Sequence, residues 1–121
     1  MYQLLEHNSI TVCDVDNTLV MWSSDFRTNK PGKTLFKYGG EDIYLKPHNF
    51  HVTFLKHCFE RGDFVVVWSQ NGYCWAKQIV DKLGLQDYVH VVASKPVRHI
   101  DDKMDLSDIV GNRIYIKDDA D

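Results

Sequence analysis

Carboxylates gather where two apolar stretches of the chain end. Residues 10–13 are apolar and β-branched, which favours a buried strand, and Asp14 and Asp16 follow it directly. One carboxylate can act as a nucleophile, while a second one beside it transfers the proton. Another acidic pair, Asp118 and Asp119, follows the last apolar stretch of the chain. Crowded carboxylates repel one another unless a cation neutralises them, so this pattern predicts a site for Mg²⁺, which prefers oxygen ligands.

A hydroxyl and an amine fall at equivalent positions. Residues 64–68 form an unbroken apolar run that ends at Ser69, and residues 89–93 form another that Ser94 and Lys95 follow. A hydroxyl donor and a positive charge suit a phosphoryl group, whose transfer depends mainly on positioning and charge stabilisation. Ser69 and Lys95, with the neighbouring Gln70, are therefore the candidates for binding phosphate.

The elements that must position these groups alternate along the chain. Each of four short apolar runs favours a strand, and amphipathic segments between them favour helices. Such alternation predicts an α/β fold, a three-layer Rossmann-like parallel sheet with helices on both faces. Ligands of such sheets bind beyond the carboxyl ends of the strands, where the candidate groups fall. The expected strands are 10–13, 64–68, 89–93 and 113–117, and the expected helices are 49–61, 73–83 and 104–110.

An insert separates the first strand from the first helix. Residues 34–38 and 42–45 flank Gly39-Gly40-Glu41, a sequence typical of a β-hairpin turn. We expect residues 19–47 to form a minimal flap within a single domain that spans residues 1–121.

Composition narrows the classes of function. The chain has 121 residues, enough for one core, and a net charge of −3, a poor match for a polyphosphate backbone. General nucleic-acid binding is therefore not expected. No apolar run is long enough for a membrane span, and no signal peptide is visible at the start. The three cysteines are scattered along the chain, at Cys13, Cys58 and Cys74. Their odd number and their spacing favour a reducing compartment, the cytoplasm.

Four segments together resemble the haloacid dehalogenase (HAD) superfamily of phosphatases. The resemblance covers residues 10–119, and the segments occur in the order of the family motifs. They are Asp14-Val15-Asp16-Asn17-Thr18-Leu19, Val65-Val66-Val67-Trp68-Ser69, Ser94-Lys95-Pro96 and Ile114-Tyr115-Ile116-Lys117-Asp118-Asp119.

The resemblance implies a Mg²⁺-dependent phosphatase that forms an aspartyl-phosphate. It makes Asp14 the nucleophile and Asp16 the general acid and base, with Ser69 and Lys95 holding the phosphate. The implied Mg²⁺ ligands are Asp14, the backbone carbonyl of Asp16, Asp118 and Asp119.

The short insert limits what can be said of the substrate. Its Gly40–Pro47 run resembles the small, nearly capless magnesium-dependent phosphatases. Such enzymes act on macromolecules or borrow a lid from a partner subunit, so a homo-oligomer is one expectation. The substrate is expected to be a phosphorylated small molecule or the phosphorylated end of a macromolecule.

Several alternatives stay open. Lys103 opens a Lys-Met-Asp-Leu segment and competes with Lys95, because phosphatases that act on protein C-terminal tails carry their lysine in a related segment. Asp101-Asp102 competes with the terminal acidic pair. The chain could also be a phosphate-binding scaffold without turnover or, more remotely, a receiver-like signalling domain. His48, His51 and His57 lack a matching cysteine pair for zinc and are expected on the surface or at a helix end.

Overall fold

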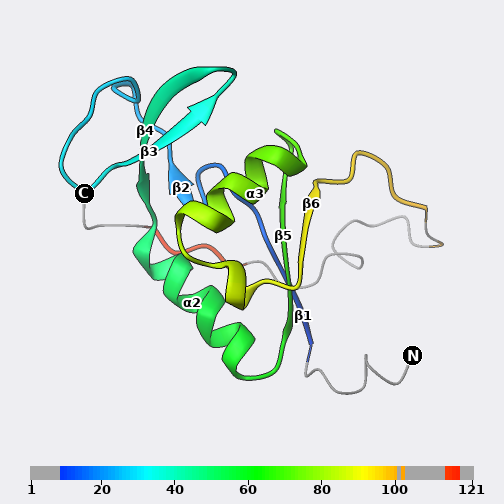
Figure 1. Cartoon of the computed structure of the whole chain (residues 1–121). Coiled ribbons are helices and arrows are strands. Elements are labelled where there is room, and N and C mark those ends of the chain that lie inside the picture. Colours follow the sequence, from blue (N-terminus) through cyan, green and yellow to red (C-terminus); the bar gives the residue numbers. More distant parts are fainter. Residues whose placement is uncertain (1–8, 101, 103–113, 118–121) are drawn as a thin grey trace.

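The computed structural model describes residues 9–100, 102 and 114–117 (Figure 1). Along this part of the chain, short strands alternate with two α-helices and one 3-10 helix. The elements are β1 (Ile10–Cys13), β2 (Val20–Met21), β3 (Thr34–Tyr38), β4 (Glu41–Pro47), α2 (Asn49–Glu60), β5 (Phe64–Ser69), α3 (Tyr73–Lys82), η1 (Gln86–Tyr88) and β6 (Val91–Ser94).

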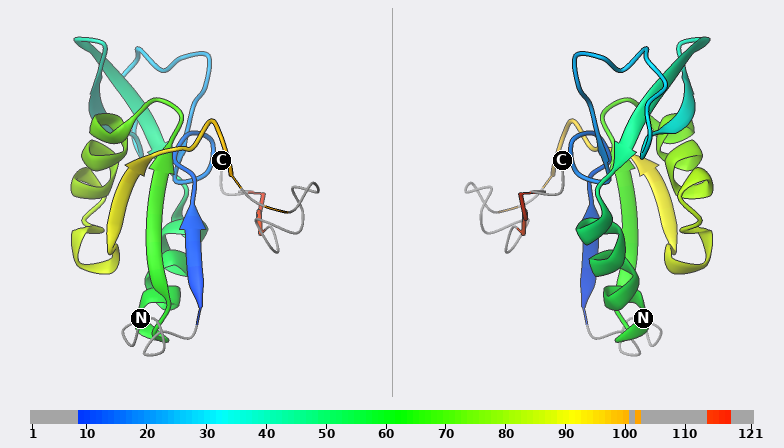
Figure 2. Two further views of the ribbon diagram at one scale, coloured as in Figure 1. Left: turned by 90° about the vertical axis from the view of Figure 1, so that its right-hand side faces the viewer. Right: turned by 90° about the vertical axis from the view of Figure 1, so that its left-hand side faces the viewer.

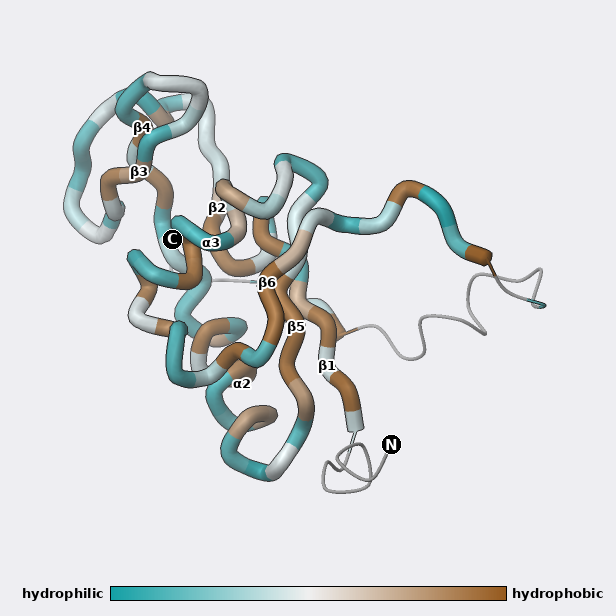
Figure 3. Tube along the Cα trace, turned by 45° about the vertical axis from the view of Figure 1, so that its right-hand side comes forward, coloured by the Kyte–Doolittle hydropathy of each residue, from teal (hydrophilic) through white to brown (hydrophobic). Residues whose placement is uncertain are grey.

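A parallel sheet with the order β1-β5-β6 forms the centre of the molecule. Cys13 pairs with Val67, and Ser69 pairs with Ser94, so the carboxyl ends of the three strands reach the same edge. Apolar residues run along these strands, as Figure 3 shows. The α/β class and the three strands predicted from apolar runs are thus confirmed, although β6 begins two residues later than the expected 89–93.

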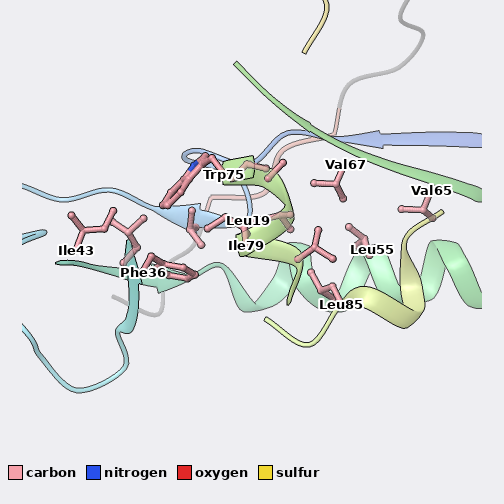
Figure 4. Packing of buried hydrophobic residues seen from close by; sticks show 14 of the residues in the cluster. Leu19, Phe36, Ile43, Leu55, Val65, Val67, Trp75, Ile79 and Leu85 are labelled. Atoms are coloured by element: carbon pink, nitrogen blue, oxygen red, sulfur yellow. The ribbon is translucent and has the colours of Figure 1, made fainter. Parts of the chain in front are cut away.

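Both α2 and α3 cover one face of this sheet, whose three strands lie side by side in Figure 2. Val65 and Val67 alternate along β5 toward that face and are fully buried. They pack in one apolar cluster with Leu55 of α2 and Ile79 of α3 (Figure 4). The cluster fills the space between the sheet and the two helices.

The opposite face of the sheet is apolar and exposed. Ile10, Val12 and Val91 have exposed fractions of 59%, 43% and 38%. Within the described residues no helix covers this face, so the expected arrangement of helices on both faces is not confirmed. The helix expected over 104–110 lies outside the described residues.

The insert forms an antiparallel sheet with the order β2-β4-β3. Tyr38 pairs with Glu41, and the two residues between them, Gly39 and Gly40, have φ angles of 59° and 84°. A two-residue turn with both φ angles positive matches the twist of a hairpin and favours glycine at both positions. The predicted hairpin is confirmed, and the two-residue strand β2 is an addition that is too short to show a sequence period.

The prediction of a strand over 113–117 was wrong. Residues 114–117 form no strand, and Arg113 lies outside the described residues. The physical reason is that both backbone polar groups of Ile116 bind histidine side chains. The Ile116 carbonyl lies 2.7 Å from Nε2 of His48, and the Ile116 N–H donates to Nε2 of His51 at 3.0 Å. These groups are therefore not available for a strand ladder.

The described helices were compared with the length and apolar content of a membrane-spanning helix. Neither α2 nor α3, nor any other helix among the described residues, has the length and apolar content needed to cross a bilayer.

Candidate active site

The chain turns sharply after β1 and so keeps Asp16 close to Asp14. The carbonyl of Val15 accepts hydrogen bonds from three successive backbone N–H groups, those of residues 18, 19 and 20, at 3.1, 2.8 and 3.2 Å. Asn17 adopts a left-handed φ of 59°, which its short polar side chain tolerates. None of these hydrogen bonds uses the carbonyl of Asp16.

The carboxylate of Asp16 is held by four donors from three segments. Oδ1 accepts from the indole N–H groups of Trp22 and Trp75 at 2.7 and 3.0 Å. Oδ2 accepts from the Ser69 hydroxyl at 3.3 Å and from the Asn71 amide at 2.8 Å. The insert, the end of β5 and the first turn of α3 therefore meet at this one side chain, which fixes its orientation.

The hairpin is fastened to the same network. Tyr38 donates its hydroxyl proton to Oδ1 of Asn71 at 3.1 Å, which directs the Asn71 NH₂ group toward Asp16. Gln78 of α3 binds the backbone N–H and carbonyl of Lys37 at 2.8 and 2.9 Å, as a neighbouring strand would. The Tyr38 ring also lies 5.0 Å from the Trp75 ring, edge to face. These contacts hold the hairpin against α3, next to the residues that bind Asp16.

Asp14 has a different environment. Its side chain is 40% exposed, and its Oδ2 lies 3.9 Å from Nζ of Lys95. The backbone N–H of Lys95 donates to the carbonyl of Ser69 at 2.9 Å, which holds the end of β6 beside the end of β5. A carboxylate that is open to solvent beside a cation is accessible to an anionic substrate.

Cys13 precedes Asp14 and is not a competing nucleophile. Burial, with a smaller contribution from the Asp14 charge, raises the pKa of its thiol to about 12. Its side chain packs against the apolar cluster. A thiol with this pKa stays protonated at neutral pH.

The structure brings together Asp14, Asp16, Ser69 and Lys95, all of which were identified from sequence. Gln70 is exposed and begins the turn that follows β5. Asp118, Asp119 and the competing Lys103 lie outside the described residues.

Three of the donors to Asp16 are not among the site residues predicted from sequence: Trp22, Asn71 and Trp75. A usable signal existed for two of them. Asn71 and Trp75 fall in the turn after β5 and the first turn of α3, which lie at the carboxyl edge of a parallel sheet.

The described residues fit part of a Mg²⁺ site. They contain no group of three or more acidic, histidine or cysteine side chains able to hold a metal ion. The Asp14 carboxylate and the Asp16 carbonyl could supply two oxygen ligands, and Mg²⁺ in proteins commonly has few protein ligands and several waters. The donor set is therefore of the right chemistry, and the expected remaining ligands follow Lys117 in the sequence.

Comparison with known families identifies the class of protein. A HAD-like phosphatase is the class of protein that the parallel sheet and the acidic loop after β1 define. The model of the family "NLI interacting factor-like phosphatase" matches residues 9–118, and the chain belongs to that family. Searches of curated proteins and of solved structures returned no match.

Proposed function

We propose that this protein is a Mg²⁺-dependent phosphatase that hydrolyses phosphate monoesters through an aspartyl-phosphate on Asp14. The observation that carries the proposal is the contrast between two carboxylates on one short loop. Asp14 is open and lies beside Lys95, whereas four donors fix Asp16 two residues further on. Membership of a phosphatase family supports the same class of reaction.

In the first step, an oxygen of Asp14 attacks phosphorus and the bond to the leaving oxygen breaks. Asp16 gives its proton to that oxygen, so the products are an alcohol and the aspartyl-phosphate. In the second step, Asp16 takes a proton from water as the water oxygen attacks phosphorus. The bond between phosphorus and Asp14 then breaks, which releases inorganic phosphate and restores both carboxyl groups.

The remaining groups hold the phosphoryl oxygens. Ser69, Gln70 and Lys95 are proposed to bind the phosphate, and Lys95 offsets the negative charge that Asp14 and the phosphate bring together. Mg²⁺, when bound, neutralises charge on the phosphoryl group. Its proposed ligands are Asp14, the backbone carbonyl of Asp16, Asp118 and Asp119.

The direct test is hydrolysis of a generic aryl phosphate by the whole chain, with Mg²⁺ and with a chelator. We expect turnover that depends on Mg²⁺ and that Asp14→Asn lowers by at least about a thousandfold, equal to roughly 4 kcal/mol of transition-state stabilisation. Asp81→Asn, on the exposed side of α3, is the matched control and should keep full activity. Phosphate binding without turnover would instead favour the scaffold alternative.

Two lysine variants decide which lysine binds the phosphate. Lys95 is proposed because it lies beside Asp14. Lys95→Met should raise the KM for the aryl phosphate and lower kcat, whereas Lys103→Met should have little effect. The opposite pattern would assign the role to Lys103.

The hairpin is proposed as a minimal flap over an open site. A hollow is lined by Lys37, Tyr38, Asn71 and Trp75, and the last two of these also donate hydrogen bonds to Asp16. This is where the leaving group of a phosphorylated small molecule or of a macromolecular end would lie. A screen of phosphorylated metabolites, phosphopeptides and end-phosphorylated oligonucleotides would identify the substrate class.

The exposed apolar face of the sheet supports a finer proposal about the fold. We infer that residues 1–121 form a single domain and that a third layer of the α/β fold covers Ile10, Val12 and Val91. A monomer in sedimentation would agree, while a dimer would place a second copy on this face. A reducing cytoplasm is proposed because Cys13, Cys58 and Cys74 are free.

A further inference from the structure

The outer strand of the hairpin binds a side chain of α3 in place of a further strand. β3 lies at one edge of the insert sheet, so within the described residues its outer backbone groups have no strand to pair with. The half-buried side chain of Gln78 lies against this edge. Its Oε1 accepts from the backbone N–H of Lys37 at 2.8 Å, and its Nε2 donates to the Lys37 carbonyl at 2.9 Å. One side-chain amide therefore binds both backbone groups of an edge residue, as a peptide group of a strand would.

These two hydrogen bonds fix the position of β3 along α3. The hairpin also packs on α3 through Phe36 and Trp75, whose rings lie 5.8 Å apart, edge to face, in the buried cluster of Figure 4. Apolar contact is non-directional, so it holds the two elements together without selecting one position of β3 along the helix. A hydrogen bond weakens steeply when its donor and acceptor move out of line. Gln78 therefore supplies directional contacts that the apolar packing lacks.

The residue after Lys37 connects this position to Asp16. Tyr38 binds Asn71 through its hydroxyl, and the Asn71 amide donates to Oδ2 of Asp16 at 2.8 Å. A shift of β3 along α3 would move Tyr38 away from Asn71. The Asn71 amide would then be free to turn away from the Asp16 carboxylate.

Trp22 is a second connection between the hairpin and Asp16. Its ring lies 5.3 Å from the Tyr38 ring, edge to face, and its indole N–H donates to Oδ1 of Asp16 at 2.7 Å. Trp22 directly follows β2, which pairs with β4 of the hairpin. A displacement of the hairpin would therefore reach both oxygens of the Asp16 carboxylate.

We propose that Gln78 is a positioning residue for phosphate ester hydrolysis. By binding the backbone of Lys37, it holds the hairpin where Tyr38 and Trp22 keep Asp16 oriented for proton transfer. Gln78 acts through the hairpin, because its amide binds Lys37 while other side chains bind Asp16. The proposal rests on the proposed function, which gives Asp16 the proton.

Two substitutions at position 78 remove these contacts while keeping the length of the side chain. Gln78→Met loses both hydrogen bonds. Gln78→Glu keeps the acceptor for the Lys37 N–H and places a second acceptor against the Lys37 carbonyl. Gln86→Glu, at an exposed position of η1, makes the same change away from the hairpin and is the matched control.

Lys37→Pro removes part of the same contact from the hairpin side. Proline has no N–H, and an edge strand tolerates it where the N–H points away from the sheet, as that of Lys37 does toward Gln78. Lys37→Ala keeps the N–H and is its control. Because both changes act on one contact, combining Lys37→Pro with Gln78→Met should lower kcat little beyond Gln78→Met alone. Lys37→Pro also serves if the variants at position 78 do not fold.

The first measurement is steady-state hydrolysis of an aryl phosphate by the whole chain with Mg²⁺. We expect Gln78→Met to lower kcat by about fivefold, the equivalent of one neutral hydrogen bond, and to leave KM unchanged. KM should hold because Ser69, Gln70 and Lys95, which are proposed to bind the phosphate, lie outside the hairpin. Gln78→Glu should lower kcat at least as much, and Gln86→Glu should have no effect. A merely structural role would change the unfolding midpoint without this split between kcat and KM.

The second measurement is hydrogen exchange followed by NMR, which needs no substrate. The indole N–H of Trp22 reports the contact with Asp16, and the backbone N–H of Lys37 reports the contact with Gln78. Gln78→Met should speed exchange at both groups by at least about fivefold. The indole N–H of Trp68, on β5, is the reference in the same spectrum and should not change.

The outcomes separate the two proposals. Unchanged exchange at Trp22 in both Gln78→Met and Lys37→Pro would overturn the positioning role and leave the phosphatase proposal standing. Faster exchange with unchanged kcat would have the same consequence. A chain that hydrolyses no phosphate ester, although Gln78→Met speeds exchange at Trp22, would overturn the proposed function and with it the role of Gln78 in turnover.

Discussion

The two ends of the parallel sheet each carry buried or half-buried aspartates, but they use them differently. At the amino end, Asp63 accepts hydrogen bonds from Ser9 at 2.9 Å and Thr11 at 2.9 Å and forms an ion pair with Arg61 at 2.9 Å. At the carboxyl end, the half-buried Asp14 places Oδ2 3.9 Å from Nζ of Lys95. The same side chain thus ties elements together at one end and remains accessible at the other.

This difference shows what makes a carboxylate structural or reactive. Burial alone would raise the pKa of Asp63, but the hydrogen bonds from Arg61, Ser9 and Thr11 outweigh it and hold the pKa below its usual value. A carboxylate whose oxygens are all paired stabilises the fold in its charged form. Asp16 combines features of Asp63 and Asp14, because both of its carboxylate oxygens accept hydrogen bonds and yet it lies in the candidate active site.

The largest expected effect that tests this contrast comes from Asp16→Asn. An amide cannot transfer the proton, so kcat should fall by about 10²–10⁴-fold. Stopped assays with an aryl phosphate measure the loss, and circular dichroism shows that the fold is kept. A variant with unchanged kcat would remove Asp16 from the reaction.

At the amino end of the parallel sheet, Asp63→Asn should lower the free energy of unfolding and leave kcat unchanged. Replacing the buried carboxylate weakens its hydrogen bonds, which should lower the free energy of unfolding by roughly 1–3 kcal/mol. Urea unfolding followed by tryptophan fluorescence measures the change. Activity per folded molecule should be retained, and a selective loss of kcat would break the division between the two ends.

The pH dependence of unfolding sharpens the same point. Because the folded pKa of Asp63 is lowered, its stabilisation is present above the unfolded pKa of about 3.9 and is lost as pH falls through the folded pKa. The difference in stability between the unchanged protein and Asp63→Asn should therefore shrink below pH ~4. A difference that is constant across acid pH would show that the charge of Asp63 is not what stabilises the fold.

The smallest effect is expected from Tyr38→Phe. This change removes the hydroxyl that orients Asn71 but keeps the ring beside Trp75. One neutral hydrogen bond is worth about 1 kcal/mol, so kcat should fall by up to roughly fivefold with KM unchanged. Steady-state kinetics with Tyr44→Phe, elsewhere on the hairpin, as the control tests this, and a rise in KM alone would mean that Tyr38 contacts substrate instead.

Sequence predicted the parts of the fold that local patterns specify. The unbroken run 64–68 could only be buried, and Gly39-Gly40 supplied the two positive φ angles of the hairpin turn. The end of each apolar run also located Asp14, Ser69 and Lys95, because parallel strands bring their carboxyl ends to one edge.

Sequence could not predict contacts that depend on tertiary placement. Residues 114–117 are as apolar as a strand, yet two histidines distant in the sequence bind the backbone of Ile116. Nothing local in the sequence indicates that the indole N–H groups of Trp22 and Trp75 both point to Asp16. The hydrogen-bond partner of an imidazole or indole nitrogen depends on how the helices and strands pack together.

The most direct test of the account is to find where the phosphoryl group resides during turnover. The Asp16→Asn variant, mixed with an aryl phosphate and Mg²⁺ and quenched in acid, is digested and its peptides are weighed by mass spectrometry. The account predicts one added phosphoryl group on the peptide that contains Asp14. Quenched protein that turns over substrate but carries the group elsewhere, or never carries it, would contradict Asp14 as the nucleophile.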